Sequence, residues 1–316
     1  MDTVNTLRPI AEIGAIVLGL VLGSFANVCI YRMPRQLSVV GPRSRCPACE
    51  RWIPWYDNIP ILSFLLLKGR CRSCGARISF RYPMVECGTA LASWLLFLHF
   101  GLSWPYLVYF LYAVALITLS VIDIDFRIIP DRISLSGFAA GLVLSALTPW
   151  LTLVDPIVSP LLGPAAERLS GCLGVLPASV AGLATSTAAG PAAVPFMQTA
   201  LNGFLRFTDS LAGALIGGGF LLVVGVLYEK VRSQEGIGGG DIKLLAMVGA
   251  FTGWQGALFT IFGGSLVASV VGVGIMIRRK SGQIPVAFGP YLSVASLLYV
   301  LAGDELIQAY LNLVQP

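Results

Sequence analysis

The chain has 316 residues, a charged fraction of 12% and a mean hydropathy of +0.81. Soluble domains carry about twice that share of charged residues, so the composition excludes an ordinary soluble protein. The composition predicts an all-α polytopic membrane protein. The net charge of +5 is informative only through the distribution of the charged residues along the chain.

Apolar runs predict about eight transmembrane helices. They lie at residues 10–31, 84–100, 104–122, 133–151, 209–228, 242–255, 257–277 and 284–302. The first run follows only Arg8 and lacks a small-residue cleavage site, so we expect it to be a retained anchor. Residues 152–207 are rich in Ala, Gly and Pro and contain no clear span.

Basic residues concentrate in alternate loops. Segments 32–83, 123–132, 229–243 and 278–283 contain 10, 2, 3 and 3 Lys or Arg residues, which is 18 of the 21 in the chain. Because positively charged loops stay in the cytoplasm, this asymmetry predicts a cytoplasmic location for all four segments.

Five regions follow from these patterns. They are an N-terminal anchor (1–31), a cytoplasmic four-cysteine domain (32–83), helices that end in an aspartate-rich segment (84–151), a non-cytoplasmic insertion (152–207) and helices that carry a Gly-rich loop (208–316).

The cytoplasmic loop contains two knuckles, Cys46-x2-Cys49 and Cys71-x2-Cys74, separated by 21 residues. Four thiolates in this pattern favour tetrahedral Zn²⁺ in a small zinc-ribbon-like domain. A redox pair or a disulfide is the alternative, although the cytoplasm disfavours a stable disulfide. With four cysteine ligands the zinc has no open position, so we expect a structural role.

Carboxylates stand at two predicted cytoplasmic helix ends. Asp123, Asp125 and Asp131 lie in "LSVIDIDFRIIPDRI", and Asp241 follows the glycines of "EGIGGGD". Ionisable groups at membrane depth indicate function by default. Two carboxylates that meet across a helix interface share a proton, so that one activates water and the other polarises a carbonyl, as in aspartic peptidases.

A structural role is the alternative for these acids, which could simply pair with Arg127, Arg132 or Lys243. Other hydrolytic chemistry has little support, because His99 is the only histidine and no serine neighbours Lys243. The glycines, Gly238 and Gly240 among them, would let Asp241 approach its partner closely.

Five stretches of the chain, in order, resemble the type IV prepilin peptidases. They are "GSFANVCIYRMP" (23–34), the two cysteine knuckles, "WYDNIPILSFLLLKGRCRSCGARISFRYPMVE" (55–86), "DIDFRIIPD" (123–131) and "GGGDIKL" (238–244). The resemblance implies that Asp123 and Asp241 are catalytic, with Asp125, Gly238 and Gly240 in supporting positions.

The resemblance also implies two activities at the cytoplasmic face of the bacterial inner membrane. One removes the leader of prepilins and pseudopilins after a glycine. The other methylates the new N-terminal amine with S-adenosylmethionine. The implied partners are these substrates, membrane lipids and the pilus or type II secretion assembly machinery, without nucleic acid.

The methyl-donor site is the least defined part of the sequence. No G-x-G-x-x-G follows a strand, so a Rossmann-type site has no support. Aromatic and acidic residues of 52–86 could hold the cofactor, and the candidates are Trp55, Asp57, Tyr82 and Glu86. A small fold packed around zinc explains these residues equally well.

Three other functions stay open at this point. A peptidase could lack methylation, and a non-catalytic assembly factor could use the zinc loop to bind a partner. A proton-coupled transporter would need acids near the bilayer midplane, whereas the sequence places Asp123 and Asp241 at the cytoplasmic lip.

Overall fold

The computed structural model describes residues 2–152, 193–232, 238–279 and 287–314. Most of the predicted insertion 152–207 therefore lies outside the described residues. The elements are α1 (Asp2–Arg32), η1 (Met33–Arg35), η2 (Trp55–Asn58), α2 (Leu62–Leu66), α3 (Arg81–Phe100), α4 (Trp104–Phe126), α5 (Asp131–Thr152), α9 (Ala193–Arg232), α10 (Gly239–Arg279) and α11 (Gly289–Val314).

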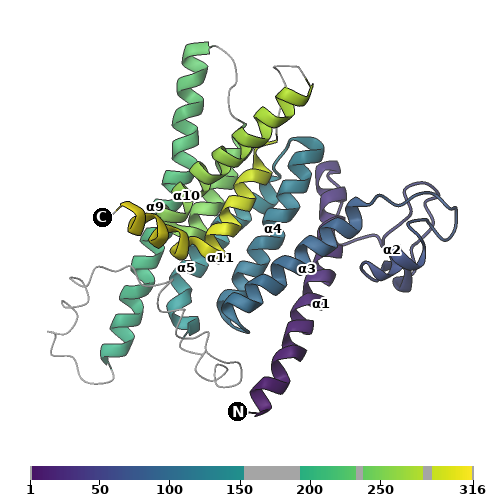
Figure 1. Cartoon of the computed structure of the whole chain (residues 1–316), viewed down its shortest axis with the longest axis horizontal. Coiled ribbons are helices and arrows are strands. Elements are labelled where there is room, and N and C mark those ends of the chain that lie inside the picture. Colours follow the sequence, from purple (N-terminus) through teal and green to yellow (C-terminus); the bar gives the residue numbers. More distant parts are fainter. Residues whose placement is uncertain (1, 153–192, 233–237, 280–286, 315–316) are drawn as a thin grey trace.

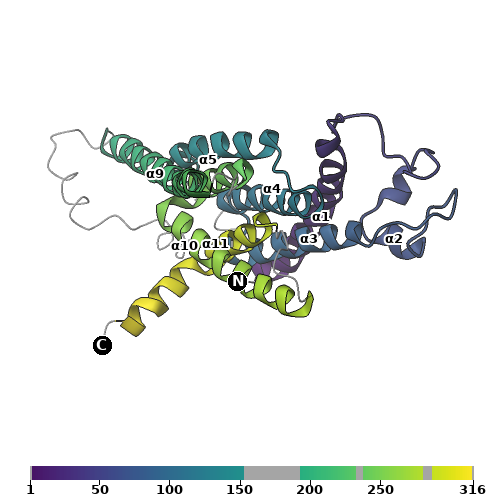
Figure 2. The ribbon, with the colours of Figure 1, turned by 90° about the horizontal axis from the view of Figure 1, so that it is seen from above.

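The long helices form two packed groups. Helices α1, α3 and α4 form one group, α5, α9, α10 and α11 form the other, and α4 contacts α11 where the groups meet. The region between α1 and α3, residues 33–80, stands to one side of the bundle and carries η2 and α2 (Figures 1 and 2). We call it the cysteine domain.

Five described helices are long and apolar enough to cross a membrane, namely α1, α3, α4, α9 and α10. This confirms a multi-pass helical protein but not the predicted count of eight spans. Part of the difference lies in α10, because the predicted runs at 242–255 and 257–277 both fall within this one element of 41 residues. At 1.5 Å per residue that length is about 60 Å, roughly twice the hydrocarbon thickness.

Helix α10 reverses direction at Gly253, whose backbone angles are φ 68° and ψ −175°. A Cβ at Gly253 would lie 2.2 Å from Asp209 Oδ2, so only glycine fits both the angle and the space. The Asp209 carboxylate also accepts a hydrogen bond from the Trp254 backbone N–H and so caps the second part of α10. This second part packs along α11, where Gly264 lies beside Leu292.

The first part of α10 crosses α9 at two glycines. A Cβ on Gly249 would lie 2.1 Å from the Gly213 carbonyl oxygen, and a Cβ on Gly213 would lie 2.4 Å from the Gly249 oxygen. Small residues at such crossings let helix backbones approach closely within a membrane, where packing is the main source of helix association.

Gly249→Val is therefore expected to destabilise the bundle, because the added side chain would force α9 and α10 apart. Overpacking of this kind costs about 1–3 kcal/mol. Thermal unfolding in detergent checks the effect, with Gly219→Ala as the control, since nothing lies within 4 Å of a Cβ at Gly219. Equal melting temperatures for the two variants would contradict the crossing.

The end of α4 and the starts of α3, α10 and α11 lie at the same end of the bundle. A buried cluster joins α4, α10 and α11 near this end and includes Leu116, Leu119, Leu244, Leu245 and Leu292. The cysteine domain lies at the same end, because Arg81 at the start of α3 pairs with Asp125 in the last turn of α4.

Two helices continue beyond this end. Gly217 on α9 lies beside Leu245 of α10, so the ten further residues to Leu227 rise about 15 Å along the axis. Exposed apolar side chains cover this extension and the last turns of α10; they are Leu222, Val223, Val226, Leu227, Val270, Val273 and Ile277. We call these two segments the apolar extensions.

Candidate active site and cysteine cluster

Asp123 lies in the last turn of α4 and is 7% exposed. Its Oδ2 accepts a hydrogen bond of 2.9 Å from the backbone N–H of Gly289, the first residue of α11. The start of α11 thus supplies a fixed donor to this carboxyl group. Helix N-termini favour such contacts because their first N–H groups have no partner within the helix.

Asp241 lies in the first turn of α10, and its backbone N–H donates to the Gly238 carbonyl at 3.1 Å. Its side chain is partly buried, and the charge of Asp123 acts on it across the helix interface. A Cβ on Gly240 would lie 3.0 Å from Ile129 Cβ, so glycine keeps the start of α10 close to the segment after α4. The structure therefore places Asp123 and Asp241, from separate helices, near enough for their charges to interact.

The other two acids serve different contacts. Asp125 pairs with Arg81, and Asp131 accepts a hydrogen bond of 2.6 Å from Lys243 Nζ. Of the ion pairs between described residues, none includes Asp123 or Asp241. Simple charge pairing at a helix end therefore accounts for Asp125 and Asp131. It does not account for Asp123 and Asp241, the predicted catalytic pair.

Sequence reasoning did not anticipate Gly289, whose only signal was its place in "FGPYL" before the last apolar run. A Cβ on this residue would lie 2.8 Å from Asp123 Oδ2. Gly289→Ala is expected to displace the carboxyl group and lower leader cleavage roughly tenfold, the effect of losing about one hydrogen bond.

Cleavage of a prepilin by purified variants measures this effect. Gly272→Ala is the matched control, because a Cβ at that position meets nothing within 4 Å. Equal rates for the two alanine variants would show that the Gly289 contact does not position Asp123.

The four cysteines form one compact cluster. The Sγ atoms of Cys46, Cys49, Cys71 and Cys74 all lie within 4.8 Å of one another, and Cys46 and Cys74 are 3.8 Å apart. A tetrahedron with metal–sulfur bonds of about 2.3 Å has edges of about 3.8 Å, so the donor set fits zinc.

The two knuckles repeat one backbone geometry. In the first, Glu50 N–H donates to the Cys46 carbonyl at 2.8 Å; in the second, Gly75 N–H donates to the Cys71 carbonyl at 2.9 Å. Glu50 and Gly75 both have a left-handed φ, of 55° and 71°. Backbone N–H groups of Cys74 and Ser73 lower the pKa of the Cys71 thiol to about 7, which favours the metal-binding thiolate.

The four residues predicted to hold a methyl donor occupy different environments. Asp57 receives hydrogen bonds of 2.7–3.1 Å from Arg72, which hold its pKa below the usual range. Glu86 is 7% exposed and accepts a bond of 2.8 Å from Ile61 N–H. The Tyr82 carbonyl accepts from Asn27 at 3.0 Å.

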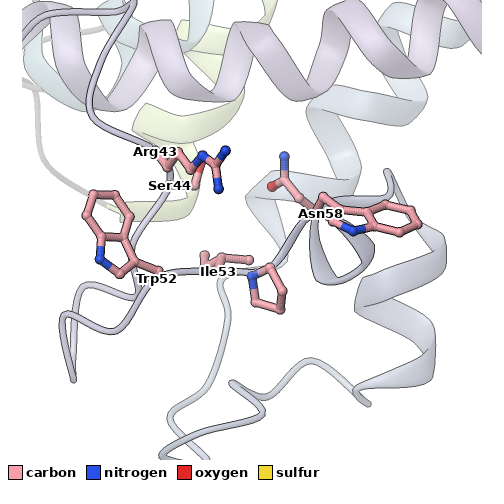
Figure 3. Close-up of a pocket in the computed structure, with 7 residues that line it drawn as sticks. Arg43, Ser44, Trp52, Ile53 and Asn58 are labelled. Atoms are coloured by element: carbon pink, nitrogen blue, oxygen red, sulfur yellow. The ribbon is translucent and has the colours of Figure 1, made fainter.

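Trp55 differs from the other three in lining a hollow of the cysteine domain (Figure 3). Glu86 connects the bundle to the cysteine domain, because it lies on α3 and bonds to the Ile61 backbone. Sequence reasoning could not separate these environments, since Trp55 and Asp57 are near neighbours in η2 and Tyr82 and Glu86 are near neighbours at the start of α3.

The fold defines a helical membrane protein that carries Asp123 and Asp241 at one end of its bundle. Residues 17–100 match the bacterial peptidase A24 N-terminal domain, and residues 175–273 match the type IV leader peptidase family. The second range contains Asp241, while Asp123 lies between the two ranges.

Full-length relatives extend these matches. The chain is 34% identical to a prepilin leader peptidase/N-methyltransferase of Pseudomonas aeruginosa, over 94% of this chain and 92% of the relative. Proteins of the same name from Stutzerimonas stutzeri and Bacillus subtilis are 32% and 31% identical, over 94% of this chain and 93% and 96% of their own lengths. No solved structure matches the chain. The chain belongs to the prepilin leader peptidase/N-methyltransferase family, which confirms the resemblance.

Proposed function

We propose that this protein removes the leader of type IV prepilins and pseudopilins and then methylates the new N-terminus. The observation that supports the peptidase is the position of Asp123 at the end of α4 and of Asp241 at the start of α10, near enough for their charges to interact. The relatives' shared name supports both activities.

The proposed hydrolysis uses both carboxyl groups. One carboxylate takes a proton from water, and the resulting nucleophile attacks the carbonyl carbon that the protonated partner polarises. The carbon–nitrogen bond then breaks, and the leaving amine takes up a proton. Gly289 N–H holds Asp123 in place through this sequence, and Gly238 and Gly239 leave room beside Asp241 for an extended backbone. We place the cleaved bond after a glycine, as in the family.

Zinc is proposed as a structural ion of the cysteine domain. The four sulfur atoms fit a tetrahedral site that four protein ligands would fill, which leaves no position for water. Cys46, Cys49, Cys71 and Cys74 would hold the ion and tie the two knuckles together.

Methylation is assigned to the cysteine-domain side of the molecule. S-adenosylmethionine, when bound, supplies a methyl group for the free amine that cleavage creates. Exposed aromatic side chains such as Trp55, which is 80% exposed, suit a positively charged sulfonium and an adenine ring.

The proposed location is the bacterial inner membrane, with the active end in the cytoplasm. The cysteine domain, the aspartate pair and the Lys243–Asp131 pair all lie at one end of the bundle, and three of the basic segments border it. Loops rich in Lys and Arg remain on the cytoplasmic side. Assembly machinery of pili or type II secretion is the proposed cellular partner.

The mass of a purified prepilin tests both activities together. Incubation with the protein in detergent is expected to remove the leader, and the mature product is expected to gain one methyl group only when S-adenosylmethionine is present. Cleavage without addition of the methyl group would mean that the protein is a peptidase that lacks the methylation activity. An intact substrate in every reaction would favour a transporter or an assembly factor.

A further inference from the structure

A hollow of about 870 Å³ opens in the cysteine domain (Figure 3), and neither Asp123 nor Asp241 lines it. Its lining residues are Arg43, Ser44, Trp52, Ile53, Pro54, Trp55 and Asn58. This combination of mostly apolar and aromatic walls with a few polar groups is typical of sites for small organic ligands. None of the lining residues belongs to the cysteine cluster.

Two indole rings of the hollow are exposed instead of packed in a core. Trp55 is 80% exposed and Trp52 is 51% exposed. The Arg45 guanidinium lies 3.9 Å from the centre of the Trp52 ring and covers one of its faces. The exposed remainder of Trp52 and most of Trp55 are available to stack with a flat, electron-poor ligand.

The polar groups of the hollow are one cation, one amide and one hydroxyl. Figure 3 shows the Arg43 guanidinium directed into the space between Trp52 and Asn58, with Ile53 along the floor. No ion pair between described residues includes Arg43. A free guanidinium of this kind suits a carboxylate, which it can bind through two parallel hydrogen bonds.

We propose that this hollow binds S-adenosylmethionine, an inference that rests on the methylation assigned above. The adenine ring would stack on an indole, and its polar edge would meet the Asn58 amide. The carboxylate of the methionine portion would pair with Arg43, and the sulfonium would lie against the face of the second indole. A lipid phosphate would also suit Arg43, but it would leave both indoles without a partner.

This assignment changes the set of predicted cofactor residues. Trp55 stays, and Arg43, Trp52 and Asn58 join it. Asp57 and Glu86 act instead as supports, because Arg72 holds the first and the Ile61 N–H holds the second. Asp57 belongs to η2, the short helix that presents Trp55 and Asn58, and Glu86 holds Ile61 just after this helix.

Binding of S-adenosylmethionine to the full-length protein in detergent, without prepilin, tests the proposal by calorimetry. Trp55→Ala and Arg43→Gln are each expected to raise Kd at least about tenfold, the effect of losing one stacking ring or one charged contact. Arg51→Gln is the matched control, because Arg51 is an exposed arginine of the same domain that does not line the hollow. Zinc content and melting temperature show whether each variant is folded.

The outcomes separate this inference from the proposed function. If wild-type protein methylates its product while folded Trp55→Ala and Arg43→Gln variants bind S-adenosylmethionine with wild-type Kd, the hollow is not the site and the function stands. If these variants keep the wild-type Kd for S-adenosylmethionine but bind anionic lipid vesicles more weakly than the wild type does, the hollow is a site for lipid headgroups. Wild-type protein that neither binds the cofactor nor methylates would overturn both proposals.

Discussion

Asp241→Asn is expected to lower leader cleavage by about 100- to 10,000-fold, the range for loss of a general acid or base. The asparagine keeps the size of the side chain but cannot exchange a proton with Asp123. Helix α10 and the cysteine domain should remain folded, because no described ion pair is broken. Prepilin cleavage in detergent measures the loss, and zinc content reports on folding.

Two further substitutions sharpen this result. Asp131→Asn removes an exposed partner of Lys243 and is expected to change the rate by less than about fivefold, since exposed ion pairs contribute little. Asp125→Asn breaks the contact with Arg81 and should be milder than Asp123→Asn. Equal losses from Asp123→Asn and Asp125→Asn would mean that the catalytic pair is assigned to the wrong acid.

Removal of zinc is expected to unfold the cysteine domain while the helical bundle stays intact. Structural zinc contributes about 10–16 kcal/mol in small zinc-binding peptides, and the two knuckles are held mainly by their own short turns and the cluster between them. Hydrogen exchange before and after chelation measures the change, and the backbone N–H groups of Glu50 and Gly75 are expected to lose protection.

The variant Cys71→Ser is expected to lower zinc content in the same experiment, and Cys87→Ser is its control. Cys87 is exposed on α3 and lies outside the cluster. Unchanged protection of the two knuckles after complete loss of metal would show that the cluster does not stabilise this domain.

Features encoded by short stretches of sequence could be predicted well. The spacing of Cys46, Cys49, Cys71 and Cys74 led to a four-cysteine cluster because each knuckle closes through its own backbone hydrogen bonds. Hydropathy likewise predicted helices over most of the apolar runs, since every buried backbone group in a bilayer needs a partner within its own helix.

Features that depend on contacts between distant residues could not be predicted. Gly289 donates to Asp123 across 166 positions of sequence, and no local pattern records that meeting. The predicted runs 242–255 and 257–277 meet a few residues after Gly253, and both the break at Gly253 and its cap from Asp209 of α9 became visible only in the fold. The contacts that separate Asp131 and Asp125, paired with Lys243 and Arg81, from the predicted catalytic pair are of the same kind.

The apolar extensions of α9 and α10 give the bundle an uneven boundary with its surroundings. Exposed valines and leucines such as Val223 and Leu227 continue to about 12 Å past the level of Lys243 on α10. Arg81 of α3 and Asp125 of α4 form their ion pair at this same end of the bundle. Hydrocarbon cannot cover these charged groups cheaply, yet it is the natural surroundings of the extensions. The bilayer must therefore be thinner beside α3 and α4 than beside α9, a hydrophobic mismatch built into one molecule. We therefore expect water to reach Asp123 and Asp241 from the thin side, and a substrate helix that approaches the extensions to stay in lipid.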